Sequence, residues 1–403
     1  MPERPSKKIY FDHGATTRVL PEVVEAMTPY VSEKYGNASS IHSFGREARM
    51  AVDSSRARVA VLIGADSSEI VFTSSGTESD NLAIKGVALH KSRGKGHIIT
   101  TDIEHSAVLE PCAYLKSKGF EVTRLPVSKD GLVDLGDVEA AIKDDTILVS
   151  VMMANREIGT IQPVREIGRI AHSRGALFHT DAVQAAGKMS IDVDRDNIDL
   201  LSISSHKFHG PKGVGALYVR KGTKVEPLLH GGGHEGGLRS STENVPGIVG
   251  FGKAAEIAQR DMPTTAERMR HLRDRIIKTV PETIPNAYLN GHPTNRLVNN
   301  VHLRFDFIEG EGLVLHLDML GIAASTGSAC STGSLEPSPV LLALGLTHEQ
   351  AHGSLRVTLG RENNDEEVSY FLEVLPGIVS KLREISPLSN GPKCNRRGGC
   401  CVQ

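Results

Sequence analysis

A lysine follows an apolar run in the segment SISSHKFHGPKGVGALYV. The run, which predicts a buried strand, closes with Ser204, Ser205, His206 and Lys207, and a glycine-rich turn comes next. Open α/β folds place their ligands at the carboxyl ends of the sheet strands. Schiff-base chemistry needs an amine in such a place, because a partly desolvated lysine is a good nucleophile near neutral pH. Lys207 is therefore the first candidate for covalent chemistry, and the alternative is a solvated loop lysine.

Hydroxyl residues and a glycine follow another predicted strand, EIVFT. Ser75, Gly76, Thr77 and Glu78 stand just before the helical pattern DNLAIKG. Backbone N–H groups and the helix dipole at such a junction attract an anion such as phosphate. The Walker A spacing G-x-x-x-x-G-K-[ST] is absent. The pattern predicts a phosphate cradle, with an ordinary helix N-cap as the alternative.

Three more polar residues follow predicted strands. Asp181 ends the strand of ALFHTDAVQAAGK, and Gln184 stands three residues later. A carboxylate there could pair with the protonated ring nitrogen of pyridoxal phosphate (PLP) and strengthen its action as an electron sink. His105, in TTDIEHSAVLE, could stack on a flat cofactor or move protons. Each residue alone has a structural explanation, but three at one edge of a sheet beside Lys207 favour a PLP enzyme.

A single cysteine, Cys330, stands among small residues in STGSACSTGS. Such a loop is expected to be exposed and able to move, so its thiol could meet a substrate and later present a product elsewhere. The alternative is an incidental surface cysteine.

The other cysteines are Cys112, Cys394, Cys400 and Cys401. They are too few and too unevenly placed for a disulfide framework, which favours a reducing, cytosolic setting. The last three lie in a polar, glycine-rich tail, where they could bind metal or relay sulfur, but incidental thiols of a flexible tail are the preferred interpretation.

The elements that must position these residues follow from hydrophobic patterning. Apolar runs such as ILVSVMM are typical of parallel strands buried on both faces, which predicts an α/β sheet. Its predicted strands cover residues 69–73, 97–100, 120–125, 146–153, 176–181, 199–204 and 215–219. Met262, Pro263 and Thr264 interrupt the pattern, and Thr264 with Glu267 predicts a capping box that opens a new helix. A smaller α+β block follows, with strands near 297–305 and 355–359 and helices near 311–320 and 365–385.

Length and composition limit the remaining possibilities. The chain has 403 residues, 39% of them hydrophobic and 23% charged, which is typical of a globular protein with about two or three domains. A net charge of -2 gives no field that would attract nucleic acid or an anionic membrane. No apolar run approaches the roughly 20 residues of a membrane span, and the first residues lack a secretory signal.

Taken together, the chain resembles the PLP-dependent cysteine desulfurases of the IscS/NifS type, in the fold-type I, class V aminotransferase group. The resemblance runs from about Tyr10 to Pro387 and rests on motifs that occur in family order. These motifs are FDHGATT, GNASSIHSFGREAR, VFTSSGTESDNLAIKG, EHSAVLEP, NREIGTIQPV, HTDAVQAAGK, SSHKFHGPKGVGALYVRKG, HGGGHEGGLRSSTENV, STGSACST and SLRVTLGREN.

The resemblance implies an architecture and a reaction. It implies a large PLP-binding domain (residues 15–262) around a mostly parallel seven-stranded sheet. It also implies a small domain (1–14 and 263–387) that carries the cysteine loop, and a flexible tail (388–403). The reaction would convert L-cysteine to L-alanine and leave the sulfur as a persulfide on Cys330, in a cytoplasmic homodimer that delivers sulfur to an acceptor or scaffold protein of iron–sulfur cluster assembly.

Site roles are also implied. Lys207 would be the Schiff-base lysine and the base at Cα, while Asp181 would bind the ring nitrogen, Gln184 the ring's phenolic oxygen and His105 the ring face. His105 would also help to deprotonate the incoming thiol. Arg356 and Asn37 would bind the substrate, and Cys330 would take the sulfur, with a transient iron–sulfur cluster on Cys330 left open. The phosphate would be bound by Gly76, Thr77, Ser204, His206 and Thr242 of the partner subunit.

Some positions depart from the family pattern. The usual Asn-Asn-Glu is Asn155-Arg156-Glu157 here. The resemblance implies that Asn155 and Arg156 both belong to the cofactor site, and the second position is expected to contact the cofactor oxygen or the substrate carboxylate. Arg156 could still donate to either anion, but it is bulkier and always charged. Ala38 replaces a proline, His13-Gly14 replaces the commoner Asn-Ala, and the tail lacks the aromatic, acidic segment that bacterial members use to dock the scaffold.

Other functions stay open from the sequence. A selenocysteine lyase keeps a comparable cysteine, whereas a class V aminotransferase has no use for the Cys330 thiol. A degenerate binding platform in cluster assembly is supported only by Arg156. A dehydrogenase is not supported, because no G-x-G-x-x-G stands at a strand–helix junction.

Overall fold

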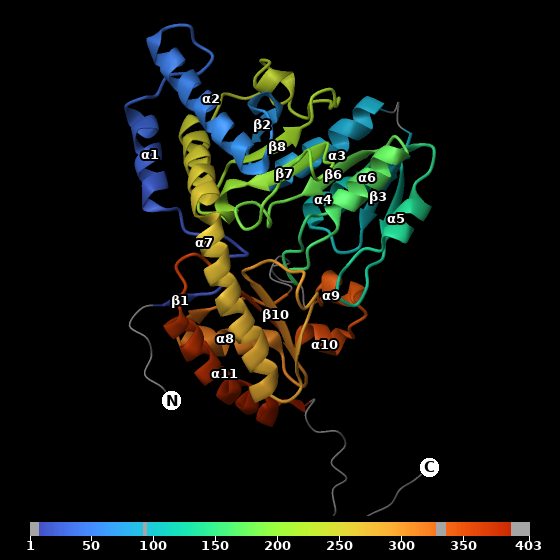
Figure 1. The fold of residues 1–403 in the computed structure, drawn as a ribbon, viewed down its shortest axis with the longest axis vertical. Helices are drawn as coiled ribbons and strands as arrows, with labels where there is room; N and C mark the ends of the chain where they lie inside the picture. Colours follow the sequence, from blue (N-terminus) through green and yellow to red (C-terminus); the bar gives the residue numbers. More distant parts are fainter. Residues whose placement is uncertain (1–7, 92–94, 328–335, 388–403) are drawn as a thin grey trace, which may run out of the picture.

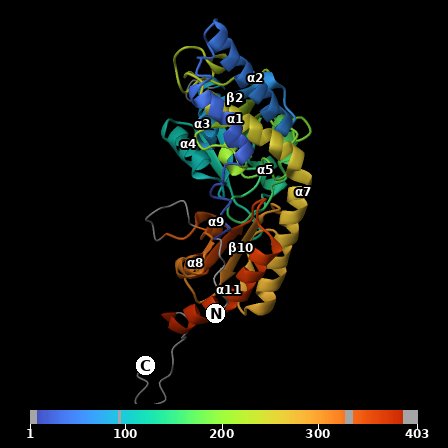
Figure 2. The same ribbon diagram turned by 90° about the vertical axis from the view of Figure 1, so that its left-hand side faces the viewer.

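The computed structural model describes residues 8–91, 95–327 and 336–387. Cys330, Cys394, Cys400 and Cys401 lie outside this described part. Figure 1 shows a large α/β unit joined to a smaller unit by the long helix α7 (Val245–Thr283), and the side view in Figure 2 shows α7 running along one side of both.

A seven-stranded sheet forms the centre of the large unit, and each of the seven strands predicted in this part of the chain supplies one strand of it. Across the sheet, the strands are β2 (Ile70–Thr73), β8 (Gly215–Val219), β7 (Leu200–Ser204), β6 (Leu177–Asp181), β5 (Thr146–Ser150), β3 (His97–Thr101) and β4 (Glu121–Leu125). Only β8 runs antiparallel to its neighbours β2 and β7. The prediction of a mostly parallel seven-stranded α/β sheet is therefore confirmed.

The sheet is buried on both faces, as its apolar runs predicted. Successive residues of a strand point to opposite faces, and Leu148 and Val149 of β5 accordingly belong to two different core clusters. The helices of this unit are α1 (Pro21–Ser32), α2 (Ser43–Ile63), α3 (Gly76–Lys91), α4 (Ser106–Ser117), α5 (Leu135–Ala141) and α6 (Val164–Ser173), with short 3-10 turns η1 (Ser67–Glu69), η2 (Ser205–Lys207) and η3 (Glu235–Gly237). Helices α3 and α4 cover one face. The core on the opposite face includes residues of α2, α5, α6 and α7, and α1 packs against α7.

The smaller unit has its own apolar core, to which Ile9 and Phe11 from the start of the chain contribute. Strand β10 lies between β12 and β9, antiparallel to both, and β1 pairs in parallel with β11. The elements are β1 (Ile9–Tyr10), β9 (Ala287–Leu289), β10 (Asn300–Phe305), β11 (Ile322–Ala323), β12 (Ser354–Thr358), α8 (Gly310–Met319), α9 (Pro339–Ala343), α10 (His348–His352) and α11 (Asp365–Ile385).

The predicted break at Met262–Thr264 is wrong. Helix α7 continues through Pro263 without ending, so no new helix begins at Thr264. The amino-terminal half of α7 packs against α1 and α2, and its carboxyl-terminal half buries Met269, Leu272 and Ile276 in the second core. Packing at both ends offsets the hydrogen bond that proline removes from a helix. The domain division at 262 remains a prediction, because α7 crosses it.

The topology brings the carboxyl ends of β2, β3, β5, β6 and β7 to one edge of the sheet, since these five strands run in the same direction. Ligands of open α/β sheets bind at this edge. Among the described helices, none combines the length and the apolar character needed to cross a membrane.

Candidate functional site

A pocket of about 310 Å³ lies at this edge of the sheet. It collects most of the site residues predicted from the sequence. Those that line it are Gly76, Thr77, His105, Arg156, Asp181, Gln184, Ser204, His206, Lys207 and Arg356. Segments that are far apart in the chain therefore contribute to one cavity.

Lys207 reaches this pocket from η2, directly after β7. Its Nζ donates hydrogen bonds to the carbonyl oxygens of Gly14 and Ala15, each at 2.7 Å. The backbone of Lys207 is held as well, because Lys188 Nζ donates to its carbonyl oxygen at 3.3 Å. Two backbone carbonyls therefore hold the amine in position at the pocket.

The predicted phosphate cradle is the first turn of α3, which begins at Gly76. The first N–H groups of a helix have no partner within the helix and can bind an anion. A Cβ atom on Gly76 would lie 2.7 Å from Cγ2 of Val183, so only glycine allows this close approach. His206 lies at the same pocket, where burial and the charge of Lys207 lower its pKa to about 4.

Asp181 ends β6 and is buried. One carboxylate oxygen accepts a hydrogen bond from the Val183 N–H at 2.8 Å. No described cation forms an ion pair with it, and burial raises its pKa to about 6. The charges of Lys207 and Arg156 partly offset this rise. A buried carboxylate that makes no ion pair among the described residues suits a protonated ring nitrogen. Gln184 Nε2 donates to the carbonyl oxygen of Gly14 at 3.0 Å, so its amide lies beside the same space.

His105 caps α4, with Nδ1 accepting a hydrogen bond from the Ala107 N–H at 3.0 Å. Burial, followed by the charges of Arg156 and Lys207, lowers its pKa to about 4. A neutral imidazole whose Nδ1 accepts carries its proton on Nε2. This arrangement suits a ring that stacks on a flat cofactor, whereas proton removal by His105 would first require release of the Ala107 bond.

Arg356 lies on β12 and is buried, with its guanidinium directed to the pocket. One terminal nitrogen donates to Asp12 Oδ1 at 3.0 Å, and its Nε has no hydrogen-bond partner among the described residues. The backbone of Arg356 also exchanges two hydrogen bonds with Ser325. The planar guanidinium of Arg356 therefore keeps an N–H group that could donate to the carboxylate of a bound substrate.

Arg156 lines the pocket, whereas Asn155 does not. The charge of Arg156 lowers the pKa values of both His105 and Asp181, so the family departure at this position alters the electrostatics of the site. The Asn155 side chain is fully buried and serves the local turn: it donates to the Ile103 carbonyl and accepts from the N–H groups of Glu157 and Ile158.

Other predicted residues also lie away from this pocket. Asn37 is exposed and its Oδ1 accepts a hydrogen bond from the Ser39 N–H. Thr242 is exposed in the loop before α7. Cys330 lies outside the described residues. Within the described part, no group of three or more His, Cys, Asp or Glu side chains could hold a metal ion.

Several pocket residues were not predicted. Asp12 accepts a hydrogen bond from Arg356, which is 344 positions away in the sequence. Its place just after a short strand was the only feature of the sequence that could have indicated a role in the site. Asp80 also lines the pocket, and its Oδ1 lies 3.6 Å from Nε2 of the buried His179. Burial and the charge of Asp181 raise the pKa of Asp80. Glu104, next to His105, is buried too, and burial raises its pKa to about 8.

Replacing Glu104 with glutamine is expected to flatten the dependence of stability on pH. The carboxyl pKa is higher in the folded state, so folding retains a proton and stability is lost as pH rises from 4.5 to about 8. Glutamine resembles the protonated acid and can keep the hydrogen bonds that Glu104 Oε1 accepts from Thr101 and Met152. The difference in unfolding free energy between pH 5 and pH 8 should shrink by about 3 kcal/mol.

Denaturant unfolding at both pH values measures this change, and the exposed Glu110→Gln on α4 serves as the matched control. Parallel pH curves for Glu104→Gln and the unaltered protein would contradict the assigned buried, protonated carboxyl.

Comparison with known proteins agrees with this geometry. The family model described as aminotransferase class-V matches residues 9–371. The cysteine desulfurase IscS of Methanosarcina thermophila is 56% identical over 385 residues, which cover 95% of this chain and 95% of that protein. A solved NifS-like protein superposes with a TM-score of 0.87 at 43% identity, covering 93% of this chain and 100% of that chain. The structure of SspA in complex with cysteine gives a TM-score of 0.78 at 39% identity, covering 87% and 98%.

Proposed function

We propose that this chain, which belongs to the class V aminotransferase family, uses the pocket around Lys207 to hold PLP and to convert L-cysteine to L-alanine. Its activity is that of a cysteine desulfurase, and the sulfur passes to Cys330 as a persulfide. The observation that carries the assignment is the meeting of Lys207, Asp181, His105 and Arg356 in one pocket at the carboxyl edge of the sheet.

The residues present fit PLP. The first turn of α3 provides an anion cradle, Asp181 is a buried carboxylate in need of a cation, and His105 is a neutral ring at the pocket wall. Lys207 would hold the aldehyde carbon, and Gln184 would reach the phenolic oxygen. When bound, PLP supplies an electron sink for the pair of electrons released at the substrate Cα.

Arg356 would fix the substrate by its carboxylate. Its guanidinium already bonds to one carboxylate, that of Asp12, and its Nε is directed to no described acceptor. A bidentate contact would align the substrate so that Lys207 Nζ can remove the Cα proton. Arg156, at the same pocket, would add a second positive charge, which strengthens binding of the substrate carboxylate.

Cys330 would be the sulfur acceptor. Ser325 lines the pocket and is tied to Arg356 by two backbone hydrogen bonds. Cys330 stands five residues later, and five residues span at most roughly 18 Å. This length is sufficient for the thiolate to reach a substrate held by Arg356. The thiolate would attack the substrate sulfur, forming an S–S bond as the C–S bond breaks and alanine leaves.

A second copy of the chain would complete the phosphate site through Thr242 of the partner subunit. The loop before α7 lies beside the cradle, since Arg239 Nε donates to Glu78 Oε1 at 2.8 Å. Two apolar side chains of the segment between α1 and α2 are unusually exposed, Ile41 at 90% and Tyr35 at 70%, which supports burial in a homodimer. The persulfide proposed on Cys330 needs a free thiol, which favours a reducing compartment such as the cytoplasm. We expect the persulfide sulfur to be delivered to a protein acceptor of iron–sulfur assembly.

The test is to supply the PLP-loaded protein with L-cysteine and a thiol reductant and to quantify alanine and sulfide, with selenocysteine in a parallel reaction. Equal amounts of alanine and sulfide are expected. Arg356→Lys should raise the KM for cysteine by about 10-fold or more while PLP stays bound, because a single ammonium cannot replace the bidentate fork. Release of selenide alone, or no change in KM for Arg356→Lys, would contradict the proposal.

A further inference from the structure

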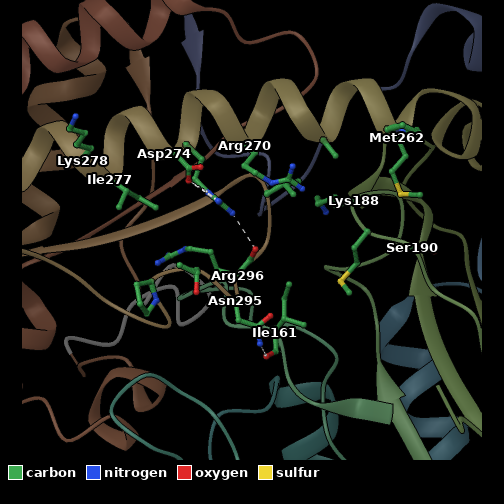
Figure 3. A pocket seen from close by; sticks show the side chains of 17 residues that line it. Ile161, Lys188, Ser190, Met262, Arg270, Asp274, Ile277, Lys278, Asn295 and Arg296 are labelled. Atoms are coloured by element: carbon green, nitrogen blue, oxygen red, sulfur yellow. Dashed lines mark hydrogen bonds and ion pairs between the residues drawn. The ribbon is translucent and has the colours of Figure 1, made fainter. Parts of the chain in front are cut away.

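A second and larger pocket, of about 770 Å³, lies between the two units on the side of α7 (Figure 3). Its walls come from the middle of α7, from the turn that follows β6 and from the loop that precedes β10. No residue lines both this pocket and the pocket of Lys207. The proposed desulfurase reaction leaves this space without a role.

Two buried cations line this junction pocket without a neutralising carboxylate. Arg296 is 2% exposed, and its guanidinium donates mainly to backbone carbonyl oxygens, among them that of Ile158 at 2.9 Å. Lys188 is 6% exposed, and its Nζ donates to the carbonyl oxygens of Gln184 and Lys207. Neither cation forms an ion pair within the described part of the chain. Burial lowers the pKa of Arg296 to about 9 and that of Lys188 to about 7, which shows how poorly these charges are compensated.

Helix α7 adds further positive charge on the face that it turns to the junction pocket. Arg270 and Arg273 line it from positions about one turn apart, and Lys278 lies about two turns beyond Arg270. Arg273 is already engaged with Asp274, the one carboxylate among the lining residues, at 2.6 Å. The side chains of Arg270 and Lys278 are exposed and have no hydrogen-bond or ion-pair partner among the described residues. In Figure 3, Arg270 extends from α7 on the side of the pocket where Lys188 lies.

The remaining wall is largely apolar. Met189, Met262, Ile277 and Val298 line it beside these cations. Sites for small organic ligands have volumes of roughly 300–1,000 Å³ and combine apolar walls with a few placed polar groups. An inorganic anion would use only the charges, whereas a molecule with an apolar part would use both kinds of wall.

We propose that the junction pocket is a binding site for an organic polyanion, a molecule with two or more phosphate or carboxylate groups on an apolar moiety. Arg270 and Lys278 would contact the negative groups directly, and the buried Arg296 would add positive potential at the pocket wall. A bound anion would also favour the protonated form of Lys188. The apolar moiety would lie against Met262 and Ile277. Because the walls come from both units, a bound molecule would also stabilise their contact.

Isothermal titration calorimetry on the PLP-loaded protein tests this site, with ATP as the probe, since ATP joins a polyphosphate to a flat, largely apolar base. ATP should bind, and adenosine and tripolyphosphate should each bind more weakly, because each lacks one half of the ligand. In Arg270→Glu/Lys278→Glu, ATP affinity should fall by about 100-fold, since two charge-assisted contacts become repulsive.

The matched control is Arg268→Glu/Lys381→Glu, which changes the net charge equally at exposed positions outside the junction pocket. Its ATP affinity should stay within about twofold, since both side chains are exposed to solvent and neither is among the residues that line the pocket. The proposal is overturned if ATP does not bind, if both double variants lose affinity alike, or if adenosine or tripolyphosphate binds as tightly as ATP. The absorbance of bound PLP is measured in the same samples. It shows whether the pocket of Lys207 still holds its cofactor, independently of whether ATP binds to the junction pocket.

Discussion

Lys207→Ala is expected to lose desulfurase activity by about 10³-fold or more, because it removes both the amine that would hold PLP and the base at Cα. The residue lies at the pocket with its Nζ held by the carbonyls of Gly14 and Ala15, and among the described residues no other lysine lines that pocket. The purified variant should also lack the visible absorbance of PLP attached to a lysine. Both quantities are measured after the protein is supplied with excess PLP.

Lys212→Ala is the matched control, because Lys212 is an exposed lysine of the turn just after Lys207. It should retain the absorbance and most of the activity. If Lys207→Ala kept the absorbance and turned over cysteine at the rate of the unaltered protein, both the assigned lysine and the assigned pocket would be wrong.

Cys330→Ala should keep the bound PLP and yet form no persulfide from L-cysteine, a loss of activity of about 10²-fold or more. The substitution removes the nucleophile and leaves all the described residues that line the pocket of Lys207 unchanged. Mass spectrometry of the protein after a single addition of cysteine, without reductant, measures the added sulfur. Cofactor absorbance in the same sample shows that the variant is still loaded.

Cys112→Ala separates this role from that of any other thiol. Cys112 is buried in α4, and burial raises its pKa to about 12, so it stays a protonated, unreactive thiol. Added sulfur should therefore be unchanged in Cys112→Ala. Persulfide found on Cys394, Cys400 or Cys401 in Cys330→Ala would instead assign the acceptor to the tail.

Local patterns in the sequence determined the elements of the sheet and the residues at their ends. Buried parallel strands have continuous apolar runs, and the glycine and hydroxyl residues that follow them are placed by local backbone geometry. For this reason Lys207, Asp181, His105 and Gly76 could all be assigned to the same edge before any tertiary contact was known.

Contacts between distant segments were decided only by the tertiary structure. Three features depend on packing that no local pattern contains. Arg356 pairs with Asp12, the Asn155 side chain is hydrogen-bonded within its own turn, and α7 continues through Pro263. The junction pocket is the clearest case, because its cations come from three separate segments. Each of these segments taken alone is an ordinary stretch of helix or loop, and the unbalanced charge arises only when folding brings them together around one space.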